Sequence, residues 1–336
     1  MNKSIYQHLI NNFDFNRIND LDYCNESFVY YFSKSIIENY DYELLTKFKS
    51  YYLNHPKLIN RLLNYSIDKT SISTGASVEP FRFFLEISNN INHTHIEKAI
   101  KSSRSNYQKL ENILPKLDIS KIRPTVQYRL LNETFKRDIK EKRSLNHSIT
   151  NLLIQHGFDL NSRSSSPKDF SHTFLSNFII NEYFDLIDEP ISWLITKGAN
   201  PFVQIYVNIS TAKSPSDLVT MNLLHYYFLQ TRPGILITNI NQLKYTLKLI
   251  PNLNTLDNWG RNILHMLLMN NKFEYQGHYE LYDSLVEAGV DPNHKATINN
   301  QEIVVKAKMK GELPKYYGQS PKEILNNQYI NNSNRH

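Results

Sequence analysis

The chain has 336 residues, 40% hydrophobic and 12% aromatic, with a net charge of +6, a composition that excludes global disorder and can supply a large core. Its single cysteine, Cys24, excludes an intramolecular disulfide and a cysteine-based zinc site. Because no run of about 18 apolar residues is present and residues 1–11 lack the apolar core of a signal peptide, we expect a soluble, cytoplasmic protein without a membrane span.

Residues 1–110 show the apolar spacing of short helices in antiparallel pairs. Asp41 is suited to cap one of these helices, and Pro56 stands at the first position of the next. Residues 69–78 form a loop rich in Ser and Thr, after which Pro80 opens another apolar helix. Helix alternating with short loop is typical of an α-solenoid. We therefore predict a helical N-terminal region that consists of degenerate repeats or a packed cap.

Positive charge is concentrated in residues 101–143, where twelve Lys and Arg stand against five Asp and Glu. Accessible cations in such a stretch bind the phosphates of nucleic acid or anionic lipid. In residues 136–143 acidic residues lie between the cations and no aromatic residue is interleaved, which is equally typical of a solvated helix end. We expect nucleic acid and anionic lipid not to be partners, and keep anion binding as an alternative. The candidate residues are Lys136, Arg137, Lys140, Lys142 and Arg143.

The most regular stretch of the chain is residues 257–293. A turn is followed by a short apolar helix whose first residues are Asn-Ile-Leu-His, at 262–265. A second helix comes next, and the stretch ends with Gly-Val-Asp-Pro-Asn at 289–293. In this order the elements closely resemble one ankyrin repeat. One repeat cannot bury its own apolar face, so Leu264 and Leu285 are expected to be buried against neighbouring helices.

Parts of the same pattern recur earlier and later in the chain. They are the helix exits at Gly157, Gly198, 249–254 and Gly289, the Ser-Pro helix starts at Ser166, Ser214 and Ser320, and the Leu-His elements at His225 and His265. Gly suits a helix end that turns left-handed, while Ser and Pro suit the cap and the first helical position. The resemblance implies about four ankyrin-like repeats over residues 111–330, in an all-α, ankyrin-type helical-repeat solenoid. The two histidines are then expected to stabilise turns.

Two insertions follow equivalent exits, at 203–211 and 297–310, and apolar and polar residues alternate in them. A period of two predicts strands. In an ankyrin-like stack these strands would lengthen β-hairpin fingers beside the concave face. The partner-binding candidates on the fingers and inner helices are Tyr206, Asn208, Ser216, Tyr226, Trp259, Asn262, Asn299 and Asn300.

The sequence contains no motif that indicates an enzyme. Phosphate-binding, nucleophile-elbow and zinc-protease motifs are not found. Cys24 lacks the surroundings of a thiol nucleophile, and His93 and His95 would not face together on a helix, so we expect no catalytic residue and no metal site. The alternative is an enzyme, for example one similar to a thiol protease, with its site in the N-terminal helical region and repeats that select the substrate.

Ankyrin-like repeats imply a protein–protein interaction scaffold that binds a protein partner on its concave surface. The irregular repeats and the abundance of Asn, Lys and Tyr resemble the ankyrin-repeat effectors that intracellular bacteria of the Legionella type inject into host cells. That resemblance implies a virulence effector that acts on a host protein in the host cytosol. We expect a monomer that needs no cofactor.

Overall fold

The computed structural model describes residues 26–39, 41–69, 79–102, 106–164, 173–181, 186–208, 218–230, 236, 238–257, 259–270, 278–297 and 316–333. Over these residues the protein is mostly helical, which confirms the expected all-α character. It forms two compact units, Met1–Phe158 (unit 1) and Asp159–His336 (unit 2). Among the described residues, no helix is both long and apolar enough to cross a membrane.

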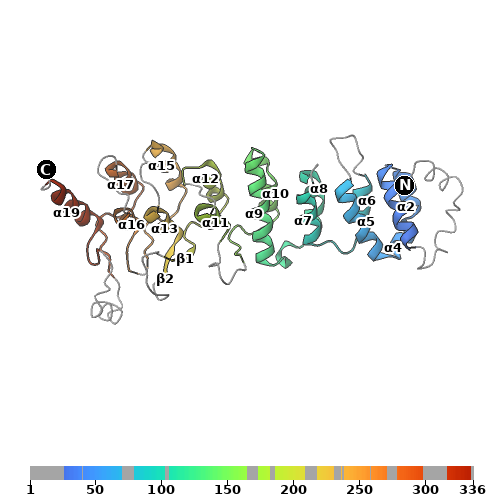
Figure 1. Ribbon diagram of the computed structural model, residues 1–336, viewed down its shortest axis with the longest axis horizontal. Coiled ribbons are helices and arrows are strands. Elements are labelled where there is room, and N and C mark those ends of the chain that lie inside the picture. The colour runs from blue at the N-terminus through green and yellow to red at the C-terminus, as the bar shows by residue number, and fades with distance from the viewer. Residues whose placement is uncertain are drawn as a thin grey trace. The chain divides into compact units, whose positions relative to one another are not determined.

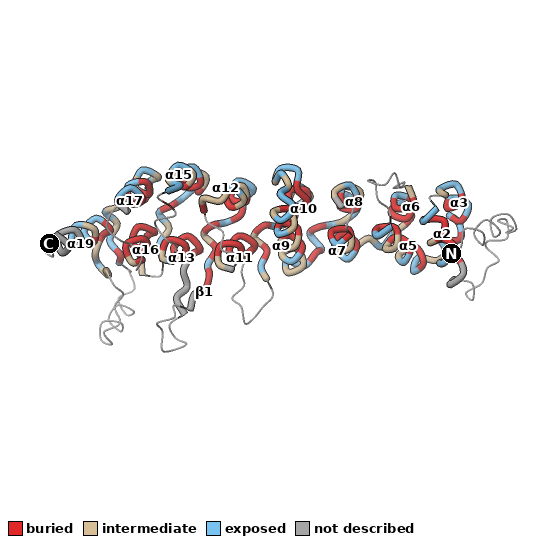
Figure 2. The backbone as a smooth tube through the Cα atoms, turned by 45° about the horizontal axis from the view of Figure 1, so that its top comes forward, coloured by how far each residue is buried: buried red, intermediate tan, exposed pale blue. Residues whose placement is uncertain are grey.

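Unit 1 is built from consecutive helices that pack as pairs. The pairs are α2 (Glu26–Glu38) with α3 (Tyr42–Lys47), α5 (Pro56–Lys69) with α6 (Glu79–Ile87), α7 (His93–Lys101) with α8 (Asn106–Ile113), and α9 (Pro124–Lys140) with α10 (Ile149–Gln155). Helix α4 (Lys49–Leu53) and the 3₁₀ helices η4 (Leu114–Lys116), η5 (Ile119–Lys121) and η6 (Leu145–His147) complete the unit. Helices α2, α5, α7 and α9 form a first row, and α3, α6, α8 and α10 form a second row (Figures 1 and 2).

Local sequence explains where these helices begin. The carboxylate of Asp41 accepts a hydrogen bond from the Leu44 amide, as expected for the cap of α3. Pro56 takes the first position of α5, as predicted. The helix expected after Asp41 is divided at Phe48 into α3 and α4.

A cluster of aromatic side chains forms the core of the first two pairs. Its fully buried members are Phe32, Phe48, Tyr51, Tyr52, Phe81 and Phe84. The rings of Tyr52 and Phe84 meet edge to face with centroids 5.3 Å apart, a favourable geometry for aromatic pairs. The described residues of the first two pairs therefore share one apolar core.

Unit 2 repeats the same arrangement with two strands added. Its elements are α11 (Phe174–Asn181), α12 (Glu189–Thr196), β1 (Gln204–Asn208), β2 (Leu218–Asn222), α13 (Leu223–Gln230), α15 (Ile240–Lys248), α16 (Ile263–Met269), α17 (His278–Glu287) and α19 (Pro321–Ser333). Helices α13, α16 and α19 pack in series as a first row, while α15 packs on α17 in a second row (Figure 2). Leu264 and Leu285 are fully buried between these helices, as predicted.

The strand expected within 203–211 is present as β1, paired antiparallel with β2 so that Gln204 faces Asn222 and Asn208 faces Leu218. The prediction of a helix that starts at Ser214 and includes Leu218 is wrong. Leu218 belongs to β2, and the next helix, α13, begins only at Leu223. The expected helix start at Ser166 and most of the insertion at 297–310 lie outside the described residues. The Ser320 start is confirmed: Ser320 and Glu323 cap the beginning of α19 reciprocally.

Three helix exits turn left-handed at glycine, as predicted. The φ angles of Gly157, Gly198 and Gly289 are 92°, 96° and 100°. At Gly157 the amide donates to Ile154, and the amide of the next residue donates to Leu153, which is the Schellman pattern of a helix end. Helix α9 ends in the same pattern, but with Lys142 at the left-handed position, at φ 53°.

Candidate functional site

The same turn follows the four helices α10, α12, α15 and α17, and in each case the residues of the turn belong to unit 2. A side-chain oxygen of an Asp or Asn accepts a hydrogen bond from the backbone amide two residues later. The pairs are Asp159 with Asn161 (2.8 Å), Asn200 with Phe202 (2.8 Å), Asn252 with Asn254 (3.0 Å) and Asp291 with Asn293 (2.8 Å). The exit predicted at 249–254, which lacks glycine, therefore has the turn geometry of the others.

Asparagine side chains connect successive turns. Asn161 donates to the carbonyl of Gly198 (3.1 Å) and accepts from the amide of Asn200 (2.8 Å). Asn254 makes the same two bonds to the next exit, donating to Gly289 (2.7 Å) and accepting from Asp291 (2.8 Å). Two asparagines at equivalent positions thus bridge equivalent backbone atoms. We call these the asparagine bridges.

Buried histidines connect the first-row helices of unit 2. Asn222 caps α13 by accepting from the His225 amide, and the ring Nε2 of His225 donates to the Arg261 carbonyl oxygen at 2.9 Å. Asn262 caps α16 in the same way, and Nε2 of His265 donates to Gln319 at 3.0 Å. Burial lowers the pKa of both rings, that of His265 to about 4. Both histidines therefore have the expected structural role.

Helix α7 in unit 1 has the same start, which sequence reasoning missed. Asn92 caps the helix, and its amide donates to Nδ1 of His95 at 3.2 Å, the distance found between Asn262 and His265. The other ring nitrogen of His95 contacts the side chain of Asn60 at 2.9 Å. The signal was the shared Asn-x-x-His spacing. The bonds to Asn92 and Asn60 explain why His95 is buried. Among the described residues, no group of three potential metal ligands is found.

The turn before α16 is fixed by an ion pair inside the protein. Asp257 and Arg261 meet at 2.6 Å, and their side chains are 0% and 7% exposed. The same carboxylate also accepts from the amides of Trp259 and Arg261, at 2.9 and 2.8 Å. This network holds the turn in one conformation and leaves Trp259 half-buried at its tip.

The turns before α16 and α19 meet through aromatic and histidine contacts. The Trp259 and Tyr317 rings are perpendicular, with centroids 6.4 Å apart. The Nε2 of His294 donates to the Gly260 carbonyl oxygen at 2.8 Å. The side chains of Trp259 and Tyr317 are both half-buried beside this turn. Large aromatic side chains held in this way are typical of protein interfaces.

The predicted partner-binding residues fall into four groups. Tyr226 and Trp259 are half-buried and lie at or beside first-row helices, where a partner can reach them. Asn262 is fully buried because its side chain caps α16 and donates to the Asp291 carbonyl, so its assignment to a binding surface is wrong. Tyr206 and Asn208 belong to β1, but their side chains are not among those described. Ser216, Asn299 and Asn300 lie outside the described residues.

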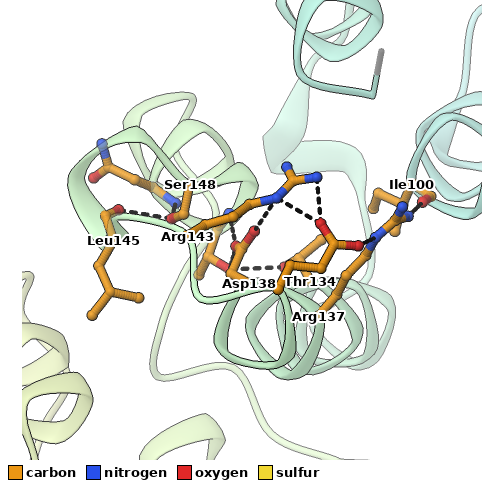
Figure 3. A network of polar contacts seen from close by, with 10 residues as sticks. Ile100, Thr134, Arg137, Asp138, Arg143, Leu145 and Ser148 are labelled. Carbon is orange, nitrogen blue, oxygen red and sulfur yellow. Dashed lines mark hydrogen bonds and ion pairs between the residues drawn. The ribbon is translucent and has the colours of Figure 1, made fainter. Parts of the chain in front are cut away.

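The five basic candidates at the end of α9 do not form one accessible set. Arg137 binds the Ile100 carbonyl and Glu141, and Arg143 binds Glu141 at 2.7 Å (Figure 3). Arg143 also approaches buried Asp138, whose carboxylate accepts from the Thr150 hydroxyl at 2.7 Å. Lys136, Lys140 and Lys142 are exposed. Arg137 and Arg143 thus bind groups of the protein at the end of α9, so their assignment as anion ligands is wrong.

A polar hollow of about 420 Å³ lies between α5 and α7 on the first row of unit 1. It is lined by Asn64, Asp68, Thr94, Glu97, Lys98, Lys101 and Ser102. Lys98 pairs with Asp68 at 3.0 Å, while Glu97 binds Lys101 at 2.7 Å and Arg129 at 2.8 Å. Hydrogen bonds from Arg129 and Lys101 lower the pKa of Glu97 to about 2, so it is ionised near neutral pH. The hollow is thus a set of ion pairs, and Glu97 is poorly suited to act as a general acid.

A search against protein-family models, curated proteins and solved structures finds no match for this chain. Function is therefore inferred from the residues and contacts described above.

Proposed function

We propose that the chain is a protein-interaction scaffold in which unit 2 is a stack of ankyrin-type repeats with β-hairpin fingers. The observation that carries this proposal is the pair of asparagine bridges, in which Asn161 and Asn254 make the same two bonds to the following exit. Repetition of one inter-repeat contact is what a stack of equivalent units requires, since each repeat is stabilised by its neighbours.

The histidine contacts support the same stack from the first row. His225 bonds to the residue before the cap of α16, and His265 bonds to the residue before the cap of α19. Helix α13 is therefore connected to the start of α16, and α16 to the start of α19. A scaffold connected at both its exits and its helix starts is rigid, and rigid surfaces lose little conformational entropy on binding.

The binding surface that we propose lies on the turns that precede the first-row helices. It includes the β1–β2 pair together with residues 209–217 that connect the two strands, the rings of Trp259 and Tyr317, and Tyr226 on the adjoining helix α13. Half-buried aromatic rings on fixed turns supply contact area at a low entropic cost, and the strand pair extends the same side of the repeat. The resemblance to bacterial effectors adds a host protein as the proposed partner. Enzyme activity in unit 1 remains the alternative.

A loop-shortened variant tests this surface. Val203 and Ile205 are buried, so the strands must be kept and only residues 209–217 replaced, by Asn-Gly, which closes a two-residue hairpin after Asn208. A second variant, Trp259→Ala with Tyr317→Ala, removes the aromatic pair. The matched control is Tyr245→Ala with Tyr279→Ala, because these tyrosines are 52% and 40% exposed on the second-row helices α15 and α17.

Partner capture from cells that express the protein is compared by affinity isolation and mass spectrometry, and folding is checked by the melting transition. We expect the first two variants to lose the partner while the control keeps it. Full capture by both surface variants would contradict the proposed surface. If only the second-row control lost the partner, the interface would lie on the second-row helices α15 and α17 instead.

A further inference from the structure

We infer that the Trp259–Tyr317 pair of unit 2 binds a proline-rich segment of the partner in the polyproline II conformation. This inference rests on the proposed function, because it names the kind of segment that one part of the proposed surface takes. It is carried by two hydrogen-bond donors that no described residue of the protein uses, by an aromatic contact between two equivalent turns, and by turns whose only charges neutralise each other.

The two aromatic residues stand at equivalent positions of their turns. Trp259 lies three residues before Asn262, which caps α16, and Tyr317 lies three residues before Ser320, which caps α19. The glycine that follows each ring has a left-handed φ, 68° before α16 and 79° before α19. The rings are perpendicular with centroids 6.4 Å apart, so the two turns together form one aromatic corner.

Both side chains of the pair carry donors that are open to a ligand. Among the described residues, none accepts a hydrogen bond from the indole N–H of Trp259 or from the hydroxyl of Tyr317. Neither group belongs to the buried polar atoms that lack a partner, so both are accessible. An indole N–H can only donate, and it usually has an acceptor where protein covers the ring. A partner that covers this pair therefore has to supply acceptors.

A polyproline II segment supplies acceptors of this kind. Its backbone has no internal hydrogen bonds, so its carbonyl groups are open, and proline has no N–H that needs an acceptor in return. A helix would leave the two donors unpaired, because its backbone carbonyls are already bonded. An extended strand would bring N–H groups for which an indole has no acceptor. Proline-rich segments also dock on aromatic side chains with little loss of conformational entropy.

The charges around the pair favour an uncharged segment. In residues 257–262 and 316–320 the only acidic or basic side chains are Asp257 and Arg261. These two form the buried ion pair at 2.6 Å that fixes the first turn. A nucleic acid or an acidic peptide would find no exposed cation in these turns, although its affinity depends on such contacts. Binding is therefore expected to be nearly independent of salt.

The test titrates the full chain against a fluorescently labelled decaproline peptide and follows the anisotropy of the label. A Gly-Ser peptide of the same length and an amphipathic helical peptide are the competing probes. Trp259→Phe keeps an aromatic ring but removes the indole N–H, and Tyr317→Phe removes only the hydroxyl. Trp259→Ala with Tyr317→Ala removes the pair. The matched control is Tyr245→Ala with Tyr279→Ala on the second-row helices, and the melting transition of each variant checks folding.

We expect each Phe variant to bind decaproline about fivefold more weakly, as for the loss of one hydrogen bond, and the double Ala variant to lose binding. The control should bind like the unaltered chain, and its affinity should change by less than about twofold between about 0.05 and 0.5 M salt. Undiminished binding by the Phe variants, equal loss in the control, or equal or tighter binding of a competing probe would overturn the inference. The Phe variants decide the matter if the double Ala variant does not fold.

Failure of this inference is distinguishable from failure of the proposed function. A chain that does not bind decaproline, but loses its cellular partner when the pair is removed, refutes the polyproline segment and keeps the proposed surface. A chain that keeps its partner after removal of the pair and after shortening of residues 209–217 refutes the surface itself, whatever decaproline does.

Discussion

At the residue scale, Gly260 is the described glycine that the backbone of another segment approaches most closely. Its φ angle is 68°, in the left-handed region, and an added Cβ would lie 2.1 Å from the Thr297 carbonyl oxygen. Gly289 also has a positive φ, at 100°, but an added Cβ would meet nothing within 4 Å. A substitution of Gly289 therefore tests the strain of the left-handed backbone alone, whereas a substitution of Gly260 tests this strain together with a steric clash.

We predict that Gly260→Ala destabilises the protein more than Gly289→Ala. Each should cost about 1–2 kcal/mol from the left-handed backbone. Gly260→Ala adds a clash with a backbone atom that cannot move as a side chain does, for a total of about 3 kcal/mol or more. Equilibrium denaturation of the two variants measures the difference. Equal losses would show that the two turns do not approach as described.

At Lys142 we predict the opposite effect, a substitution that increases the stability of the protein. It occupies the left-handed position at the end of α9, at φ 53°, where three other helices have glycine. We expect Lys142→Gly to stabilise the protein by about 0.5–1 kcal/mol, because glycine adopts this conformation without a steric penalty. Lys142→Ala is the control, as it removes the charge but keeps the Cβ. If the two variants have the same stability, then backbone strain at this position is negligible.

At the element scale, the asparagine bridges connect one helix exit to the next through single side chains. We predict that Asn254→Ala lowers the free energy of unfolding by about 1 kcal/mol, the usual net contribution of exposed hydrogen bonds. The backbone amide of Asp291, which donates to Asn254, should then exchange with solvent faster. Asn254→Asp keeps an acceptor for this amide and is expected to preserve its protection. An unchanged Asp291 exchange rate in Asn254→Ala would show that the bridge is not formed in solution.

The first-row histidines make the junctions sensitive to acid. Burial lowers the pKa of His265 from 6.5 to about 4, so the unfolded state binds the proton more tightly. The stability contributed by His265 is fully present above pH 6.5 and is lost as the pH falls from 6.5 to 4. The direction is the same for His225. We therefore predict a steeper loss of stability between pH 7 and 5 in the unaltered chain than in His265→Gln, measured by denaturation at each pH. Parallel pH profiles would contradict this assignment.

The sequence predicted contacts made within one helix start or one helix end. The caps at Asp41 and Ser320 and the left-handed glycines depend on residues a few positions apart, and the inward position of Leu264 follows from the apolar spacing within α16. It failed where a side chain reaches another element. Asn262 resembled an accessible residue on an inner helix but is buried at a junction, and Arg143 belongs to a network around Asp138.

At the scale of the whole molecule, the two units differ in charge and in the contacts that connect their helices. Unit 1 has the whole net positive charge and a first-row surface of cations, tyrosines and ion pairs. Unit 2 is neutral overall and is connected by recurring asparagine and histidine contacts. Helix pairs are common to both, and the Asn92–His95 start shows that unit 1 also uses the cap found in unit 2.

The central claim is that the turns before the first-row helices of unit 2 bind a protein partner. The most direct test places a photo-crosslinking amino acid at Trp259 in one protein and at Tyr245 in another, both in the full chain inside cells that express it. The account predicts a discrete cross-linked protein from position 259 and none from the exposed position 245 on α15. Cross-links of the same protein from both positions, or from position 245 alone, would contradict it.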